Sequence, residues 1–206
     1  VELNLRFYSQ QAAYEKARYE AEHDGMTGLL NKKAGWKHMR KYFDRMDSHD
    51  EAMLMFVDID DFKIINDTYG HTVGDFWIRE VASQLRHIYR QDDIICRYGG
   101  DEFIVLIRNT ASEQVLETTL SMFFQQLTRA SEQHGQDVHC SVGVCRIAAI
   151  RISGNRDTSK NTDGGNGEDT RGGVDFGQCV KQADLALYET KRFNKGTFNV
   201  YNYDRS

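Results

Sequence analysis

The chain has 206 residues, which fits one domain with an appended segment, and 40% of them are hydrophobic, enough for a packed core. Its 26 basic and 31 acidic residues give a formal net charge of −5, which argues against nonspecific nucleic-acid binding. No run reaches the ~20 apolar residues of a membrane span, and no signal-peptide pattern is present. The four cysteines lack metal-ligand spacing. We therefore expect buried thiols, a cytoplasmic location, alone or within a membrane-anchored or multidomain protein, and no membrane contact by this chain.

Residues 1–23 have the composition of a helix, with no glycine and many Glu, Gln, Ala, Lys and Arg residues. Apolar residues recur every seven positions in two rows, namely Leu5, Ala12 and Tyr19, and Phe7, Tyr14 and Ala21. Polar residues at several seam positions weaken this heptad. The segment is therefore either a coiled-coil-like linker or a solvated helix that packs on nothing within this chain.

Helices and strands alternate along the rest of the chain. The apolar patterns predict helices over about 31–46, 62–68, 74–89, 112–133 and 183–191, and strands over 53–57, 94–96, 103–107, 138–150 and 197–201. We expect Thr27 or Asn31 to cap the second helix and Asp60 or Asp61 to cap the third. Residues 153–176 contain six of the 17 glycines and almost nothing apolar, which predicts a flexible insertion.

The order of these elements predicts an α+β fold. Five strands alternate with helices, and two of the strands form a hairpin in the middle of the chain. An antiparallel hairpin between crossover connections favours a mixed five-stranded sheet covered by helices, as in the ferredoxin-like arrangement.

The central hairpin is the most informative stretch. Its two apolar runs flank Gly99 and Gly100, which is typical of a tight turn between antiparallel strands. Asp101 and Glu102 follow at once, so two acids lie beside bare glycine backbone. Such acids indicate a metal and a close ligand, although an ordinary acidic hairpin tip is an equal alternative on these residues alone.

A second acidic turn favours the metal interpretation. The apolar run 53–57 leads directly into Asp58. A carboxylate at the end of a strand, near another acidic turn, is the arrangement by which phosphoryl-transfer enzymes hold Mg²⁺.

Two motifs together resemble those of GGDEF-domain diguanylate cyclases. One is Arg97-Tyr98-Gly99-Gly100-Asp101-Glu102-Phe103, and the other runs from Asp58-Ile59-Asp60-Asp61-Phe62-Lys63 to Tyr69-Gly70-His71. The resemblance covers about residues 24–202 and implies a cyclase domain over 24–206 with a palm like that of nucleotidyl cyclases. In this family, a helix such as residues 1–23 pairs with its twin and joins the cyclase to an upstream sensor domain, so we expect a fragment of a longer protein.

The resemblance also implies a set of site residues. Asp58, Asp101 and Glu102 would be catalytic, and the same three residues with the Ile59 carbonyl would hold Mg²⁺ or Mn²⁺. GTP would be bound by Asn66, Asp75, Phe62, Lys63, Gly99, Gly100, Lys191 and Lys195. Lys195 stands where the family usually has arginine, which keeps the charge but removes the bidentate geometry. Asp75 is a suitable acceptor for the N–H donors of guanine, although either Asn66 or Asp75 alone is more often a helix cap.

The implied reaction joins two GTP molecules into cyclic di-GMP and two pyrophosphates, and it needs two domains facing each other as a homodimer. Arg90 and Asp93 match the Arg-x-x-Asp inhibitory site at which the product binds. The simpler alternative is that Arg90 and Asp93 only end the preceding helix and start the following strand. The alternative function is a catalytically weak GGDEF module that senses GTP or cyclic di-GMP. A cyclase that uses ATP is disfavoured by Asp75.

Overall fold

The computed structural model describes residues 2–149 and 174–204. Its helices are α1 (Glu2–Glu22), α2 (Lys32–Phe43), α3 (Phe62–Tyr69), α4 (His71–Ile88), α5 (Glu113–His134) and α6 (Phe176–Phe193). Its strands are β1 (Leu30–Asn31), β2 (Ala52–Ile59), β3 (Ile94–Arg97), β4 (Glu102–Arg108), β5 (Cys140–Ile147) and β6 (Phe198–Asn202).

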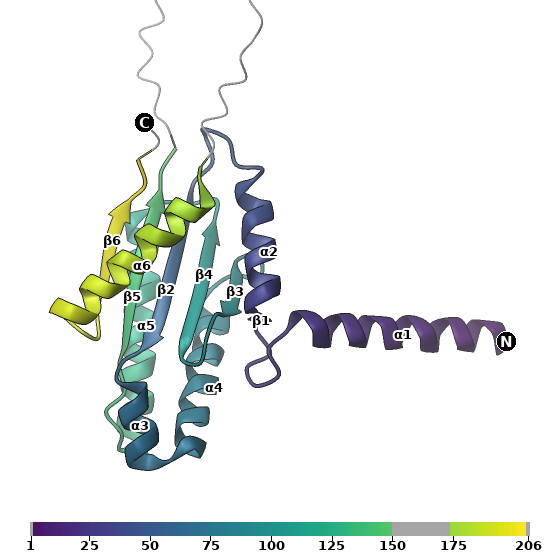
Figure 1. The fold of residues 1–206 in the computed structure, drawn as a ribbon, viewed down its shortest axis with the longest axis horizontal. Coiled ribbons are helices and arrows are strands. Elements are labelled where there is room, and N and C mark those ends of the chain that lie inside the picture. The colour runs from purple at the N-terminus through teal and green to yellow at the C-terminus, as the bar shows by residue number, and fades with distance from the viewer. Residues whose placement is uncertain (1, 150–173, 205–206) are drawn as a thin grey trace, which may run out of the picture.

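The strands form one mixed sheet in the order β1-β3-β4-β2-β5-β6 (Figure 1). Strand β2 is central and antiparallel to both β4 and β5, whereas β1 pairs with β3 and β5 with β6 in parallel. The predicted α+β fold with a mixed, helix-covered sheet is confirmed. The sixth strand, β1, was not predicted because two residues are too short to show a periodic pattern.

Helices cover both faces of the sheet, with α4 and α5 on one side and α2 and α6 on the other (Figure 1). All eight residues of β2 are buried, and their side chains alternate between the two layers. Met53 and Met55 pack with the α4 and α5 residues, whereas Leu54 and Phe56 pack with those of α2 and α6. Burial of each large apolar side chain contributes about 1.5–3 kcal/mol, so β2 is fixed in register by both cores.

The structure confirms one predicted helix start and corrects two others. Helix α2 is capped by Asn31, whose side chain accepts a hydrogen bond from the Ala34 amide at 3.0 Å. Helix α4 begins at His71 rather than near Gly74, because a single residue, Gly70 with φ of +86°, is enough to separate α3 from α4. Asp61 is the N-cap residue of α3 but makes no side-chain capping bond.

The predicted insertion at residues 153–176 lies largely outside the described residues. Its last residues do not fit the prediction, because Val174 and Phe176 are both buried. The Phe176 ring lies 4.9 Å from Trp36 and 5.0 Å from Phe43, measured between centroids. Residues from Val174 onward therefore pack against the rest of the domain, and α6 begins inside the segment that was predicted to be flexible.

Helix α1 points away from the sheet and its covering helices (Figure 1). Its aromatic side chains are exposed, from 54% for Tyr19 to 69% for Tyr14. Within the described part of the chain, no helix combines the length and apolar character needed to cross a membrane. The pairing of α1 with a second copy remains a prediction.

Candidate active site

The register of the sheet brings the three predicted catalytic acids to one end of β2 and β4. Asp58 is paired with Glu102 on one side and with Ser141 on the other. The Ile59 amide donates a hydrogen bond to the Asp101 carbonyl at 3.3 Å, which ties the hairpin turn to the end of β2. Acids that are far apart in the sequence thus become neighbours because β2 ends where its antiparallel partner β4 begins.

The turn between β3 and β4 is closed by its own backbone. The amides of Tyr98 and Gly99 both donate to the Glu102 carbonyl, at 2.8 and 3.2 Å. A Cβ added at Gly99 would lie 2.6 Å from the Glu102 carboxylate, whereas one added at Gly100 would meet nothing within 4 Å. The first glycine therefore makes room for an acidic side chain of this chain, and the second leaves open space beside the acids.

Lys191 of α6 is the counter-ion of Asp58. Its ammonium lies 2.6 Å from Asp58 Oδ1, although no hydrogen bond of good geometry reaches that buried oxygen among the described residues. Burial raises the pKa of Asp58 to about 6, Lys191 opposes this rise, and the nearby charges of Asp101 and Glu102 add to it. The interaction with Lys191 therefore only partly offsets the cost of burying the Asp58 charge.

This donor set suits a hard divalent cation. Carboxylate and carbonyl oxygens are the ligands that Mg²⁺ takes, and it usually binds few protein groups while phosphate oxygens or water complete its shell. A cation placed here would compensate the buried Asp58 oxygen. Among the described residues, no three His, Cys, Asp or Glu side chains are already gathered as a metal site, so any site would be completed by a ligand.

The N-cap residue of α3 makes no side-chain hydrogen bond to the first turn of the helix. Its N-cap residue, Asp61, has the left-handed φ of +51°, which is uncommon for a residue other than glycine. The Asp61 carboxylate accepts hydrogen bonds from Lys195 at 2.7 and 2.8 Å instead of capping the helix. The amides of Phe62 and Lys63 thus begin a helix without a side-chain cap, which favours anion binding at this end.

Asp60 has a structural role and does not cap α3. Its carboxylate accepts the Ser141 hydroxyl at 2.8 and 2.9 Å and the Gly196 amide at 3.0 Å. These bonds hold the loop after α6 against β5. They also fix the position of Lys195, the residue before Gly196, near the start of α3.

Asn66 and Asp75, the predicted guanine-binding pair, lie on the adjacent helices α3 and α4. The contact between these helices is close at Gly74, where an added Cβ would lie 2.0 Å from Asn66 Oδ1 and 3.1 Å from the Phe62 ring. Asn66 therefore lies against the backbone that carries Asp75. The structure thus places Asn66 next to the residue that precedes Asp75, and their shared role in guanine binding remains a prediction.

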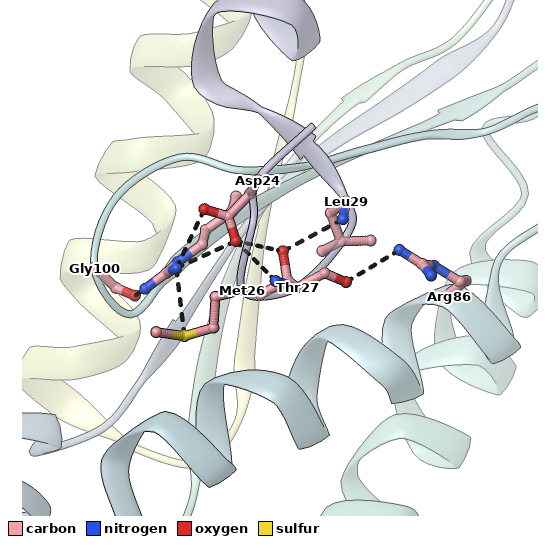
Figure 2. A network of polar contacts seen from close by, with 7 residues as sticks. Asp24, Met26, Thr27, Leu29, Arg86 and Gly100 are labelled. Carbon is pink, nitrogen blue, oxygen red and sulfur yellow. Dashed lines mark hydrogen bonds and ion pairs between the residues drawn. The ribbon is translucent and has the colours of Figure 1, made fainter. Parts of the chain in front are cut away.

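A network of polar contacts joins Gly100 of the hairpin turn to Asp24 and Met26, which follow α1, and Figure 2 shows these residues; the contacts pass through the Arg97 guanidinium. The Arg97 guanidinium donates to the Gly100 carbonyl at 2.7 and 3.1 Å and contacts the Asp24 carboxylate at 3.2 Å. Asp24 also accepts the Thr27 amide and hydroxyl, at 2.9 and 2.8 Å, and these bonds with Arg97 lower its pKa although burial opposes them. Arg97 and Asp24 were not predicted as site residues, although Arg97 opens one of the two motifs and Asp24 begins the stretch that the resemblance covers.

Arg90 and Asp93, the predicted inhibitory pair, lie in the loop between α4 and β3. The Asp93 carboxylate accepts the Arg90 amide at 2.9 Å through one oxygen and the Arg108 amide at 3.1 Å through the other. The side chain of Arg90 is exposed. Asp93 thus does shape the loop, and its fixed carboxylate keeps lone pairs for a further donor.

Comparison with known proteins assigns the chain to a family. The family model described as "Diguanylate cyclase, GGDEF domain" matches residues 21–163. The chain belongs to the GGDEF family. The resemblance predicted from the two motifs is confirmed, and the mixed sheet is the fold that GGDEF domains share.

Among curated relatives, this GGDEF domain is 32% identical over 200 residues to the probable diguanylate cyclase DgcC of Escherichia coli K12. The match covers 91% of this chain and 48% of DgcC, so the chain spans about half of that relative. It is also 30% identical to the cyclic di-GMP phosphodiesterase PdeR of Escherichia coli K12, covering 93% of this chain and 26% of PdeR. Family membership alone therefore does not establish cyclase activity.

Solved GGDEF structures share the fold. The coiled coil and GGDEF domain of DgcB from Caulobacter crescentus, in complex with c-di-GMP, superposes with a TM-score of 0.75 at 23% identity, covering 97% of this chain and 96% of that one. The diguanylate cyclase SiaD of Pseudomonas aeruginosa, in complex with its activator SiaC, gives a TM-score of 0.69 at 25% identity, with 98% and 70% covered.

Proposed function

We propose that this GGDEF domain is a diguanylate cyclase that condenses two GTP molecules into cyclic di-GMP and two pyrophosphates. The observation that carries the proposal is the meeting of Asp58, Asp101 and Glu102 at one end of the sheet, through the pairing of β2 with β4. The helix α3, whose first turn has no side-chain cap, begins at the same end.

Asp58 and Asp101, with the Ile59 carbonyl and Glu102, would hold Mg²⁺ or Mn²⁺. When bound, the ion supplies positive charge that neutralises the triphosphate and the acids. Without it, each like-charge pair at 4 Å costs about 4 kcal/mol at an effective dielectric of 20. The buried carboxylate of Asp58, whose pKa is raised even though Lys191 lies 2.6 Å from Oδ1, supports this assignment.

The neighbouring groups suit the rest of GTP. The Phe62 and Lys63 amides at the start of α3 bind the terminal phosphates, together with the ammonium groups of Lys191 and Lys195. Asn66 and Asp75 bind guanine, because a carboxylate accepts its N1–H and N2–H donors and would face an acceptor in adenine. The open space at Gly100, next to Gly99, accommodates the nucleoside.

The reaction needs two of these sites facing each other, because each domain holds one GTP. The 3′-hydroxyl of one GTP attacks the α-phosphate of the other, an O–P bond forms, and pyrophosphate leaves. Glu102 accepts the hydroxyl proton or contributes to metal binding. The same exchange in the opposite direction closes the ring. We assign the homodimer contact to α1, which would also link the domain to an upstream sensor in a longer protein.

Product inhibition completes the proposal. Cyclic di-GMP binds at Arg90 and Asp93, since a guanidinium suits a phosphate or the Hoogsteen edge of guanine and a carboxylate accepts guanine N1–H. A bound product at this loop holds the two active sites apart. The alternative function is a catalytically weak module that senses GTP or cyclic di-GMP, and it stays open because a relative at 30% identity, PdeR, is named a phosphodiesterase and not a cyclase.

The deciding experiment is incubation of the purified protein with GTP and Mg²⁺, followed by chromatographic identification of the product. We expect cyclic di-GMP from the wild type and nearly none from Asp101→Asn or Glu102→Gln. Asp92→Asn is the matched control, because this acid is 92% exposed and lies in the loop before β3. Nucleotide binding without any product from the wild type would favour the sensor, and wild-type rates in both variants would refute the assignment of these acids.

A further inference from the structure

A hollow of about 490 Å³ lies between the end of α1 and the body of the domain. Its wall on the α1 side includes Tyr19 and His23, and its wall on the body side includes Arg86, Arg90 and Asp93. The hollow thus contains the Arg90–Asp93 pair and also residues from both sides of the turn that follows α1. None of the α1 residues was singled out by the motifs.

The α1 side of the hollow is an aromatic surface. The rings of Tyr19 and His23 are stacked, with centroids 3.8 Å apart and an angle of 13° between their planes. The His23 Nδ1 is 2.9 Å from the Tyr19 carbonyl, which fixes the imidazole on the last turn of α1. Tyr19 is 54% exposed, so the stacked pair is accessible. Base stacking on exposed aromatic side chains is a common mode of nucleotide binding.

The body side adds a second guanidinium beside Arg90. Arg86 Nη2 donates to the Thr27 carbonyl at 3.2 Å, which brings this side chain across to the turn after α1. A Cβ added at Gly28 would lie 3.4 Å from Arg86 Nη2 and 3.6 Å from the Tyr19 hydroxyl. Arg86 and Tyr19 therefore converge over Gly28, at the boundary between α1 and the domain.

We propose that cyclic di-GMP binds across this hollow, an inference that rests on the product inhibition proposed above. Tyr19 and His23 provide a stacking surface for one guanine, and Arg86 provides a second cation beside Arg90. The two guanidinium groups of Arg86 and Arg90 match the two phosphodiester charges of the ligand. Asp93 then accepts the guanine N1–H with its remaining lone pairs. Bound product touches both sides of the turn and so restrains the direction of α1.

The consequence is reciprocal coupling between α1 and the product site. If product restrains α1, then a signal that changes the direction of α1 changes the affinity for product by the same free energy. Product inhibition would in this way depend on the state of α1.

The test is calorimetric titration of the full chain with cyclic di-GMP. We expect Tyr19→Ala and Arg86→Gln to weaken binding by roughly fivefold to 100-fold, the range for loss of one stacked base or one charged hydrogen bond. Tyr19→Phe keeps the ring and should bind like the wild type. The controls are Tyr8→Ala and Arg79→Gln, residues of α1 and α4 that lie outside the hollow and outside the two heptad rows, which should leave binding unchanged.

Hydrogen exchange of residues 22–31 with and without cyclic di-GMP tests the restraint on α1. We expect protection in the wild type and its loss in Tyr19→Ala. Wild-type affinity in both Tyr19→Ala and Arg86→Gln, with binding lost in Arg90→Ala, would overturn this inference and leave the product site intact. No binding by the wild type would overturn both. Weakened binding in the variants without any protection in the wild type would overturn the coupling to α1.

Discussion

Replacement of Asp58 by asparagine should stabilise the metal-free protein at neutral pH. Burial raises the pKa of Asp58 to about 6 from an ordinary value of 3.8. A carboxyl group with a raised pKa in the folded state binds its proton more tightly there than in the unfolded chain. Its charge therefore lowers stability progressively as the pH rises from about 4 to 6, and the full cost is present above pH 6. An asparagine side chain at this position would be neutral at every pH and free of this cost.

The magnitude follows from the two pKa values. Each pKa unit corresponds to about 1.4 kcal/mol, so the full effect above pH 6 is about 3 kcal/mol. That value already includes the favourable interaction with Lys191. Because local relaxation and water reduce such costs, we expect about 1–3 kcal/mol, which raises the Tm by about 2–12 °C for a chain of this size.

Thermal unfolding at pH 4 and pH 8 in the presence of a chelator measures the effect. Asp58→Asn should melt higher than the wild type at pH 8 and close to it at pH 4, and added Mg²⁺ should raise the Tm of the wild type alone. Asp60→Asn is the matched control, since an amide there would face the donors of Ser141 and Gly196 and should lower the Tm. If Asp58→Asn melts at or below the wild type at pH 8, the argument from burial is wrong.

Three further predictions concern the substrate site. Asp75→Ser should relax the preference of kcat/KM for GTP over ATP by on the order of 1–3 kcal/mol, and an unchanged ratio would exclude Asp75 from base recognition. Gly74→Ala should raise KM for GTP, because the new methyl group displaces the Asn66 side chain, and a wild-type KM would contradict that contact. Arg97→Gln should lower kcat by loosening the turn at Gly100, with hydrogen exchange of residues 98–101 as the structural readout; unaltered exchange and kcat would show that Arg97 does not hold the turn.

Local patterns were sufficient to predict the elements that carry the acids. The two apolar runs around Gly99 and Gly100 predicted the hairpin, and the run before Asp58 predicted β2. Strand β1 was not predicted because it is only two residues long and is defined by its pairing with β3. Phe176 was misjudged because a single aromatic residue after a polar stretch gives no periodic signal, although tertiary contacts bury it.

The contacts between distant segments could not be predicted from periodicity. Arg97 and Asp24 are 73 positions apart, and although Arg97 opens one of the two motifs, nothing in the local pattern pairs it with Asp24. The ion pair between Lys191 and Asp58 likewise depends on how α6 lies over β2 and β5. The sequence also could not show that α3 lacks a side-chain cap, because its N-cap residue, Asp61, is of a type that usually caps helices.

The Lys191–Asp58 ion pair has a consequence for the order in which ligands bind. The Lys191 ammonium lies 2.6 Å from Asp58 Oδ1, and while it neutralises this acid it cannot fully serve a phosphate. A divalent ion bound at Asp58, as proposed above, would take over the neutralisation of the acid and free the lysine for the nucleotide. Metal and triphosphate should therefore bind with positive cooperativity, each increasing the affinity for the other, and Lys191 works as an exchangeable counter-ion between the two.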